Sequence, residues 1–111
     1  MDTSSLLQRE LQGSVEFFLD FTNRDPHSPG FGLTVDATKK PQIASIAATG
    51  FALSGWVIAA ERGLLPPQQA LEITRGTLHT LLHNVSHHRG FFAHFLDMKT
   101  AQRRGKCEYS T

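Results

Sequence analysis

The sequence predicts an all-α fold, with helical hairpins joined by long loops. Three stretches carry this prediction: the first and third repeat apolar residues at helical spacing, and the second is uncharged along its whole length. Segments rich in Pro, Gly, Asp and Ser separate the first two stretches. At 111 residues the chain is one small domain at most.

The first helix is expected from Leu6 to Thr22. Its apolar stripe recurs every three or four residues and consists of Leu7, Leu11, Val15 and Phe18. Ser5 and Gln8 predict a capping box at its start. The following segment, residues 23–41, is expected to be a long ordered loop, and such loops in compact enzymes often carry function.

The second helix is expected from Ile43 to Ala60, and Gly63 predicts its end. This run is long enough to meet the crude length criterion for a membrane span. Its many Ala, Gly, Ser and Thr residues, and a mean hydropathy of -0.23 for the whole chain, argue against a span. We therefore expect no membrane span, and instead a helix buried on every side with Phe51 and Trp56 as its bulky anchors.

The third helix is expected from Gln68 to Asn84, after a start at Pro66-Pro67. Its apolar stripe consists of Leu71, Leu78, Leu81 and Leu82. Two flanking helices cannot surround the second one, so the sequence predicts uncovered apolar surface that a domain remainder, self-association or a partner would cover. The segment from Arg89 to Lys106 is expected to be loop with short extended pieces, and Glu108 is expected to open a fourth helix.

Charge and motif content exclude several classes of function. The formal net charge of +1 and the pI of about 8.0 give no field of one sign, so neither nucleic acid nor an anionic membrane surface is expected as a partner. The sequence has no P-loop, dinucleotide fingerprint, serine nucleophile elbow or Cys/His metal module, so no cofactor and no metal are expected. The lone Cys107 excludes an internal disulfide, and the polar N-terminus predicts no secretory signal.

The segment from Arg89 to Thr111 contains most of the side chains that could bind a ligand or take part in catalysis. It combines flat apolar faces with a hydrogen-bonding imidazole in Phe91, Phe92, His94 and Phe95. Asp97 and Glu108 add two carboxyl groups that can move protons, as glycoside hydrolysis requires. This combination of groups suits a sugar ligand.

Several short blocks of the chain occur in an order that resembles a known family. They are Phe21–Asn23, Gly32-Leu33 with Asp36, Ser45–Gly50, Glu61–Gly63, Gly90–Asp97 and Cys107–Thr111. In this order they resemble the glycoamylase-like family, which includes the endo-β-1,2-glucanases and a domain of the cyclic β-1,2-glucan synthases. The resemblance runs from about Leu11 to Thr111. It implies the N-terminal part of an (α/α)6 toroid of paired helices, and a bacterial periplasmic or cell-envelope location.

The resemblance also implies a function and a set of site residues. The function is that of a glycoside hydrolase or transglycosylase acting on β-glucan, with β-1,2-glucan as the implied substrate. The chain would supply one wall of the sugar cleft and be inactive alone. Asp97 and Glu108 match positions in or beside the cleft and are the catalytic candidates. Asp36 matches an acidic position there, although the family's Pro-Asp-Arg is Val-Asp-Ala in this chain.

The substrate-binding candidates besides Asp36 are Phe91 and Phe92, which could stack on pyranose faces, and His94, which could bind a hydroxyl. Two further departures from the family pattern predict a reshaped cleft: Ala93 replaces an aromatic residue and Tyr109 replaces a leucine.

Structural roles remain alternatives for several of these residues. One or two of the aromatic side chains can be core residues, Asp97 can cap a turn, and Glu108 can be an exposed carboxylate. His79, His83 and His87 recur every fourth residue, which is a spacing that can bring imidazoles to one metal ion, but no cysteine or carboxylate completes the set. The alternative to an enzyme is a noncatalytic helical module that self-associates or binds a protein partner.

Overall fold

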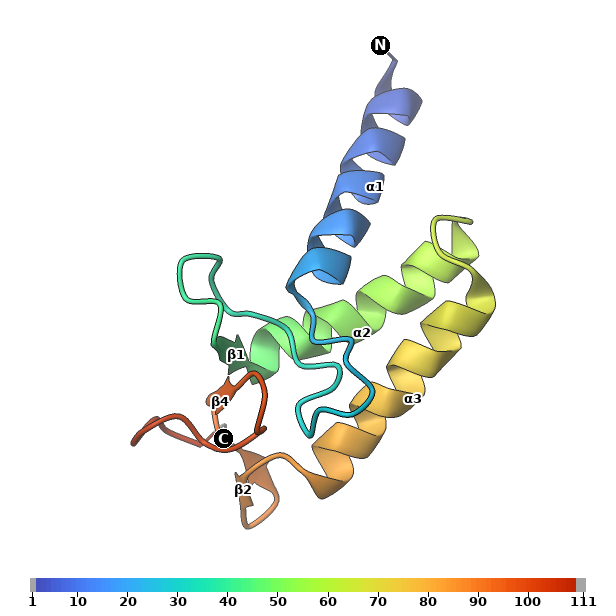
Figure 1. Ribbon diagram of the computed structural model, residues 1–111. Helices are drawn as coiled ribbons and strands as arrows, with labels where there is room; N and C mark the ends of the chain where they lie inside the picture. The colour runs from blue at the N-terminus through green and yellow to red at the C-terminus, as the bar shows by residue number, and fades with distance from the viewer. Residues whose placement is uncertain (1, 110–111) are drawn as a thin grey trace.

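The computed structural model describes residues 2–109, which form a mixed α/β fold (Figure 1). The helices are α1 (Thr3–Phe21), α2 (Ile46–Glu61) and α3 (Pro67–His83). The strands are β1 (Ile43–Ser45), β2 (His87–His88), β3 (Phe91–Phe92) and β4 (Phe95–Asp97), and they make two antiparallel pairs, β1 with β4 and β2 with β3. The prediction of an all-α fold, and with it that of an (α/α)6 toroid segment, is wrong, because the segments flanking the α2–α3 hairpin pair with each other as strands.

Helix α1 follows the predicted amphipathic stripe but starts earlier than expected. The carboxylate of Asp2 accepts a hydrogen bond from the backbone N–H of Ser5 at 2.7 Å and caps the helix. The predicted capping box of Ser5 and Gln8 is therefore wrong. The N-terminal half of α1 projects from the body of the molecule in Figure 1, and residues 3–10 are all exposed.

The apolar run predicted as one helix is divided between β1 and α2. Residues 43–45 are extended because they pair with β4, with Ile43 opposite Asp97 and Ser45 opposite Phe95. The Ser45 hydroxyl then accepts a hydrogen bond from the N–H of Ala48 at 3.0 Å, which caps α2. The helix ends as predicted, with Gly63 in the left-handed conformation at φ 71°.

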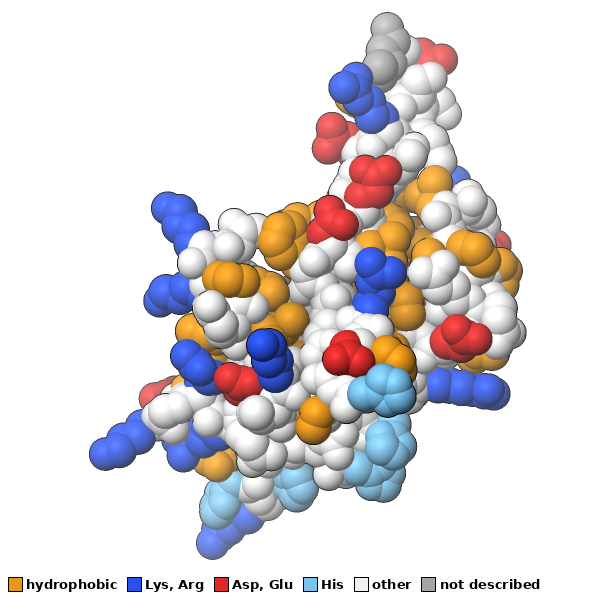
Figure 2. Space-filling view, in the orientation of Figure 1, with side chains coloured by type: hydrophobic (Ala, Val, Ile, Leu, Met, Phe, Trp, Pro, Cys, Tyr) orange, Lys and Arg blue, Asp and Glu red, His pale blue; other side chains and the backbone are white. Residues whose placement is uncertain are grey.

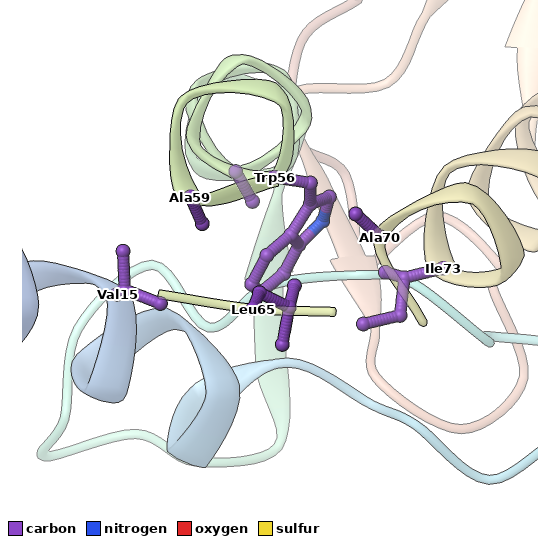
Figure 3. Packing of buried hydrophobic residues seen from close by; sticks show 7 residues of the cluster. Val15, Trp56, Ala59, Leu65, Ala70 and Ile73 are labelled. Carbon is purple, nitrogen blue, oxygen red and sulfur yellow. The ribbon is translucent and has the colours of Figure 1, made fainter. Parts of the chain in front are cut away.

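Trp56 lies at the centre of the core between the three helices (Figure 3). Its buried neighbours come from α1, α2, α3 and the turn between the last two helices, and they are Val15, Ala52, Ala59, Leu65, Ala70 and Ile73. Trp56 is thus the anchor that the sequence predicts. Phe51, the other predicted anchor, is 71% exposed.

Helix α2 buries one stripe and leaves the rest of its apolar surface in solvent. The buried residues are Thr49, Ala52, Trp56 and Ala59, which recur at helical spacing. Phe51, Val57 and Ile58 on its other faces are exposed. The prediction of a helix buried on every side is wrong for this chain, whereas the predicted uncovered apolar surface is confirmed. No helix among residues 2–109 combines the length and the apolar character needed to cross a bilayer.

A second core lies beneath the strands. Its buried members are Leu33, Ala44, Val85, Ala93, Leu96 and Ala101. A buried hydrogen bond of 2.8 Å between the hydroxyls of Thr22 and Thr34 joins the two ends of the loop after α1. The Thr34 N–H donates to the Thr49 hydroxyl of α2 at 3.1 Å. This loop is therefore ordered, as predicted, and it connects the helical core to the strands.

The C-terminal segment contains the short extended pieces that the sequence predicts, in β3 and β4. The expected fourth helix at Glu108 is not formed within the described residues. Tyr109 instead makes an antiparallel bridge with Ala93, and the carbonyl of Glu108 accepts a hydrogen bond from the N–H of His94 at 2.8 Å. The segment is extended because it pairs with the chain beside β4.

Candidate functional site

The pairing of β1 with β4 brings two of the sequence blocks together at a hollow of about 270 Å3, here called the strand-end hollow. Asp36 enters it from the loop before β1, and Phe95 enters it from β4. The N–H of Asp36 donates to the carbonyl of Ile43 at 3.1 Å, which holds the loop beside the sheet. The remaining lining residues are Ala37, Lys40, Ile43, Arg104 and Cys107.

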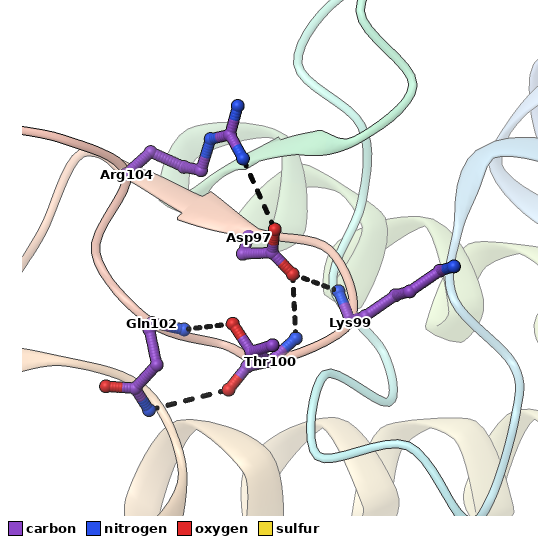
Figure 4. Close-up of polar contacts among 5 residues, drawn as sticks. All are labelled: Asp97, Lys99, Thr100, Gln102 and Arg104. Carbon is purple, nitrogen blue, oxygen red and sulfur yellow. Dashed lines mark hydrogen bonds and ion pairs between the residues drawn. The ribbon is translucent and has the colours of Figure 1, made fainter.

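Asp97 caps the turn that follows β4 (Figure 4). One carboxylate oxygen accepts hydrogen bonds from the N–H groups of Lys99 and Thr100, each at 2.9 Å, and the other lies 3.3 Å from the guanidinium of Arg104. The backbone hydrogen bond from Thr100 is the main cause that lowers the pKa of Asp97, and partial burial opposes it.

An Asp97 carboxyl group with a lowered pKa is ionised at neutral pH. A general acid must hold a proton at the working pH, so this environment does not favour Asp97 as the proton donor. Its catalytic assignment stays a prediction, limited to the roles that an ionised carboxylate can fill.

Glu108 is exposed and lies near the other end of the same extended segment. Its carbonyl is bonded to the N–H of His94, three residues before Asp97. Three residues of chain span at most about 10 Å, and His94 lies at a bend just before β4, so the backbones of His94 and Asp97 are no more than about that far apart. Catalytic carboxyl groups of inverting glycosidases lie about 6.5–9.5 Å apart, and a catalytic pair here would need side chains turned toward each other.

The three phenylalanines of this segment have different surroundings. Phe92 is half-buried and packs against the core beneath the strands, so it is mainly a structural residue. Phe91 and Phe95 are 49% and 37% exposed, and Phe95 lines the strand-end hollow. The ring of His94 is half-buried and lies edge-on to that of Phe95, with 6.3 Å between centroids. Faces for stacking are thus available on Phe91 and Phe95.

Lys40, Arg104 and Cys107 line the hollow without having been predicted as site residues. The thiol of Cys107 lies 3.4 Å from both the N–H and the carbonyl oxygen of Phe95, which fixes the C-terminal segment beside β4. The sequence contains no motif for these contacts, because they depend on the pairing of residues far apart in the chain.

Positive charge gathers around the strand-end hollow. Residues 36–40 and 89–108 contain seven of the eleven Lys and Arg residues but three of the ten Asp and Glu residues. Figure 2 shows blue side chains projecting along the edge that carries β1 and β4, and red side chains along α1. Within residues 2–109, Arg104 with Asp97 is the one ion pair, so most of these cations face solvent.

The histidine pattern does not assemble a metal centre. The rings of His79 and His83 are 4.6 Å apart between centroids on α3, whereas His87 lies in β2. In the part of the chain that the structure describes, we find no group of three or more His, Cys, Asp or Glu side chains that could hold one metal ion.

Comparisons of this chain with models of known protein families, with curated proteins and with solved structures found no match. The chemistry and geometry of its own residues are therefore the basis for a functional assignment.

Proposed function

We propose that this chain contributes one wall of a saccharide-binding cleft in a glucan-active enzyme, a glycoside hydrolase or transglycosylase. The main supporting observation is that Asp36 and Phe95 line the same hollow. They belong to two separate blocks of the glycoamylase-like resemblance, which implies β-1,2-glucan as the substrate.

The strand-end hollow offers the groups that a pyranose ring requires. The partly exposed ring of Phe95 presents an apolar surface to the C–H face of a sugar. The Asp36 carboxylate accepts hydrogen bonds from hydroxyl groups, and the Lys40 ammonium donates them. Arg104 also lines the hollow and is held at its rim by Asp97.

The isolated chain is expected to be inactive. Glycoside hydrolysis needs a proton donor and a second carboxylate that acts as base or nucleophile. The Asp97 environment favours the ionised form, so Asp97 suits the second role or the orientation of Arg104. Glu108 is exposed near the other end of the segment, and the complete pair would require a further segment of the enzyme.

Binding of β-1,2-glucan to the 111-residue chain, measured by isothermal titration calorimetry, tests the proposal. Phe95→Ala is expected to weaken binding by about fivefold or more, because stacking on an aromatic face contributes on the order of 1 kcal/mol or more. Phe51→Ala is the matched control, because it removes an exposed phenylalanine from α2. Equal affinities of Phe95→Ala and the unmodified chain would exclude Phe95 as part of the cleft.

A noncatalytic module that self-associates is the second candidate function. It is supported by the large apolar side chains exposed on the helix pair, namely Phe51, Val57 and Ile58 of α2 and Leu71, Leu78 and Leu82 of α3. This function predicts a discrete oligomer in light scattering and no glucan affinity. A stable monomer that unfolds cooperatively would argue against it.

A further inference from the structure

A second hollow, of about 670 Å3, lies between the loop that follows α1 and one side of α3. We call it the loop–helix groove. The loop contributes Arg24, His27 and Phe31, and the helix contributes Gln69, Glu72 and His79. It shares no lining residue with the strand-end hollow. None of the sequence blocks chosen as site candidates forms it.

Close packing fixes the two walls of the groove relative to each other. The ring of Phe31 packs directly against Gly76 of α3, and one residue further along the chain Gly32 packs against Thr77. At the C-terminal end of α3, the side-chain amide of Asn84 donates to the carbonyl of Pro29 at 3.0 Å. A groove fixed in this way pays little ordering cost when a ligand enters.

The floor and the rim of the groove differ in chemistry. The half-buried Phe31 supplies most of the apolar surface between the walls, because Ile73 is only 4% exposed. The rim carries both donors and acceptors, in Arg24, His27, Gln69, Glu72 and His79. Arg24 uses its Nε to donate to the carbonyl of Leu19 at 3.1 Å, which leaves its terminal nitrogens available. Figure 2 shows histidine side chains gathered around the C-terminal half of α3.

The charge of the lining restricts the class of ligand. With its histidines neutral, the groove carries one cation, Arg24, and one carboxylate, Glu72. Such a lining favours neither an anion nor a cation, and its histidine and glutamate side chains, all among the described residues, are not placed together to hold one metal ion. An apolar floor with donors and acceptors of both kinds around it suits a ring that has C–H faces and several hydroxyl groups.

We propose that the loop–helix groove binds a neutral saccharide, as a site separate from the strand-end hollow. The C–H face of the sugar lies on the floor made by Phe31 and Ile73. Its hydroxyl groups bond to Gln69, His79 and Glu72 on the helix wall and to Arg24 on the loop wall. This site does not depend on the proposed glucan cleft, because the two hollows have different walls.

The test is calorimetric titration of the Phe95→Ala chain with glucose trisaccharides in β-1,2, β-1,4 and α-1,4 linkage. Phe95→Ala weakens the other proposed site, and the groove variants below identify the share of the heat that comes from the groove. At least one trisaccharide is expected to bind. Adding Gln69→Ala or His79→Ala is expected to weaken binding by about fivefold, as the loss of a hydrogen-bond partner worth about 1 kcal/mol does. His87→Ala, which removes an exposed histidine of β2 outside the groove lining, is the matched control.

Three results would overturn the proposal. Absence of binding by all three trisaccharides removes the site. Unchanged affinity in both the Gln69 and the His79 variant, with folding verified by circular dichroism, places the ligand elsewhere. Glucan binding that Phe95→Ala abolishes altogether would support the strand-end cleft and contradict the groove.

Discussion

The ring of Phe31 packs against Gly76 of α3 in the space that a Cβ atom at position 76 would occupy. The contact joins the loop after α1 to the middle of a helix. Gly32, at φ 87°, makes a similar approach to Thr77. The course of this loop, and with it the shape of the loop–helix groove, thus depends on the missing side chain at position 76.

Gly76→Ala is expected to destabilise the fold. Alanine gains about 1 kcal/mol over glycine within a helix, but overpacking against a ring costs about 1–3 kcal/mol. We expect the overpacking to dominate and the free energy of unfolding, measured with urea, to fall by about 1 kcal/mol.

Gly13→Ala is the matched control for this variant. Gly13 also lies inside a helix, but a Cβ there would meet no atom within 4 Å. Only the gain in helix propensity applies, so this variant is expected to be more stable by up to about 1 kcal/mol. Equal stabilisation by the two substitutions would mean that Phe31 does not pack as described.

Asp97→Asn is expected to lower stability near neutral pH and to have little effect in acid. The hydrogen bond from the Thr100 N–H, above all, lowers the pKa of Asp97 in the folded chain. The ionised carboxylate therefore stabilises the fold above its unfolded pKa of about 3.9, and this contribution is lost as the pH falls through the lower folded value. We expect the unfolding free energies of the two proteins to differ by about 1 kcal/mol near pH 7 and to converge once the pH has fallen below the folded pKa of Asp97.

Arg104→Gln distinguishes the contribution of the Asp97–Arg104 ion pair from that of the hydrogen bonds that Asp97 accepts in the turn. The Arg104 side chain is 43% exposed, and exposed ion pairs contribute about 0–1 kcal/mol. This variant is expected to change stability by less than about 0.5 kcal/mol at any pH. A larger loss for Arg104→Gln than for Asp97→Asn would show that the ion pair, and not the turn, is the main partner.

Trp56→Phe is expected to be tolerated far better than Trp56→Ala. The indole is buried, and its Nε1 has no hydrogen-bond partner among the described residues. Phenylalanine keeps most of the packing and removes the unpaired N–H, so the loss is expected to stay below about 2 kcal/mol, against about 3–5 kcal/mol for alanine. Chemical unfolding followed by circular dichroism measures both, since Trp56 is the one tryptophan of the chain. Similar losses for both variants would contradict the packing of the Trp56 ring in the core.

The helices were predictable because their signals are local. The apolar stripe of α1 and the prolines before α3 lie within the elements that they define. Strand β1 was not predictable in this way, because Ile43 and Ala44 continue the apolar run of α2. Their extended conformation depends on hydrogen bonds to β4, whose residues lie far along the chain. The all-α prediction failed for the same reason, since strands of two or three residues are too short to show a period.

The candidate site was predictable in part. The sequence indicated Asp36 and the aromatic segment, but the shared hollow of Asp36 and Phe95 depends on the β1–β4 pairing. Asp97 has a recognisable turn signal, since aspartate often accepts a bond from the N–H two residues ahead, here that of Lys99. For the loop–helix groove the sequence indicated only that the loop of residues 23–41 could carry function, because the groove itself arises where this loop packs on a helix near Gly32 and Gly76.

The most direct test of the proposed cleft is a titration of the isotopically labelled chain with a β-1,2-linked gluco-oligosaccharide, followed by backbone amide NMR shifts. Saturable shifts of residues 36–43 and 95–107 are expected, because these two segments line the strand-end hollow. Shifts confined to the loop–helix groove, or no shifts at any position, would contradict the assignment of the strand-end hollow as a wall of a glucan cleft.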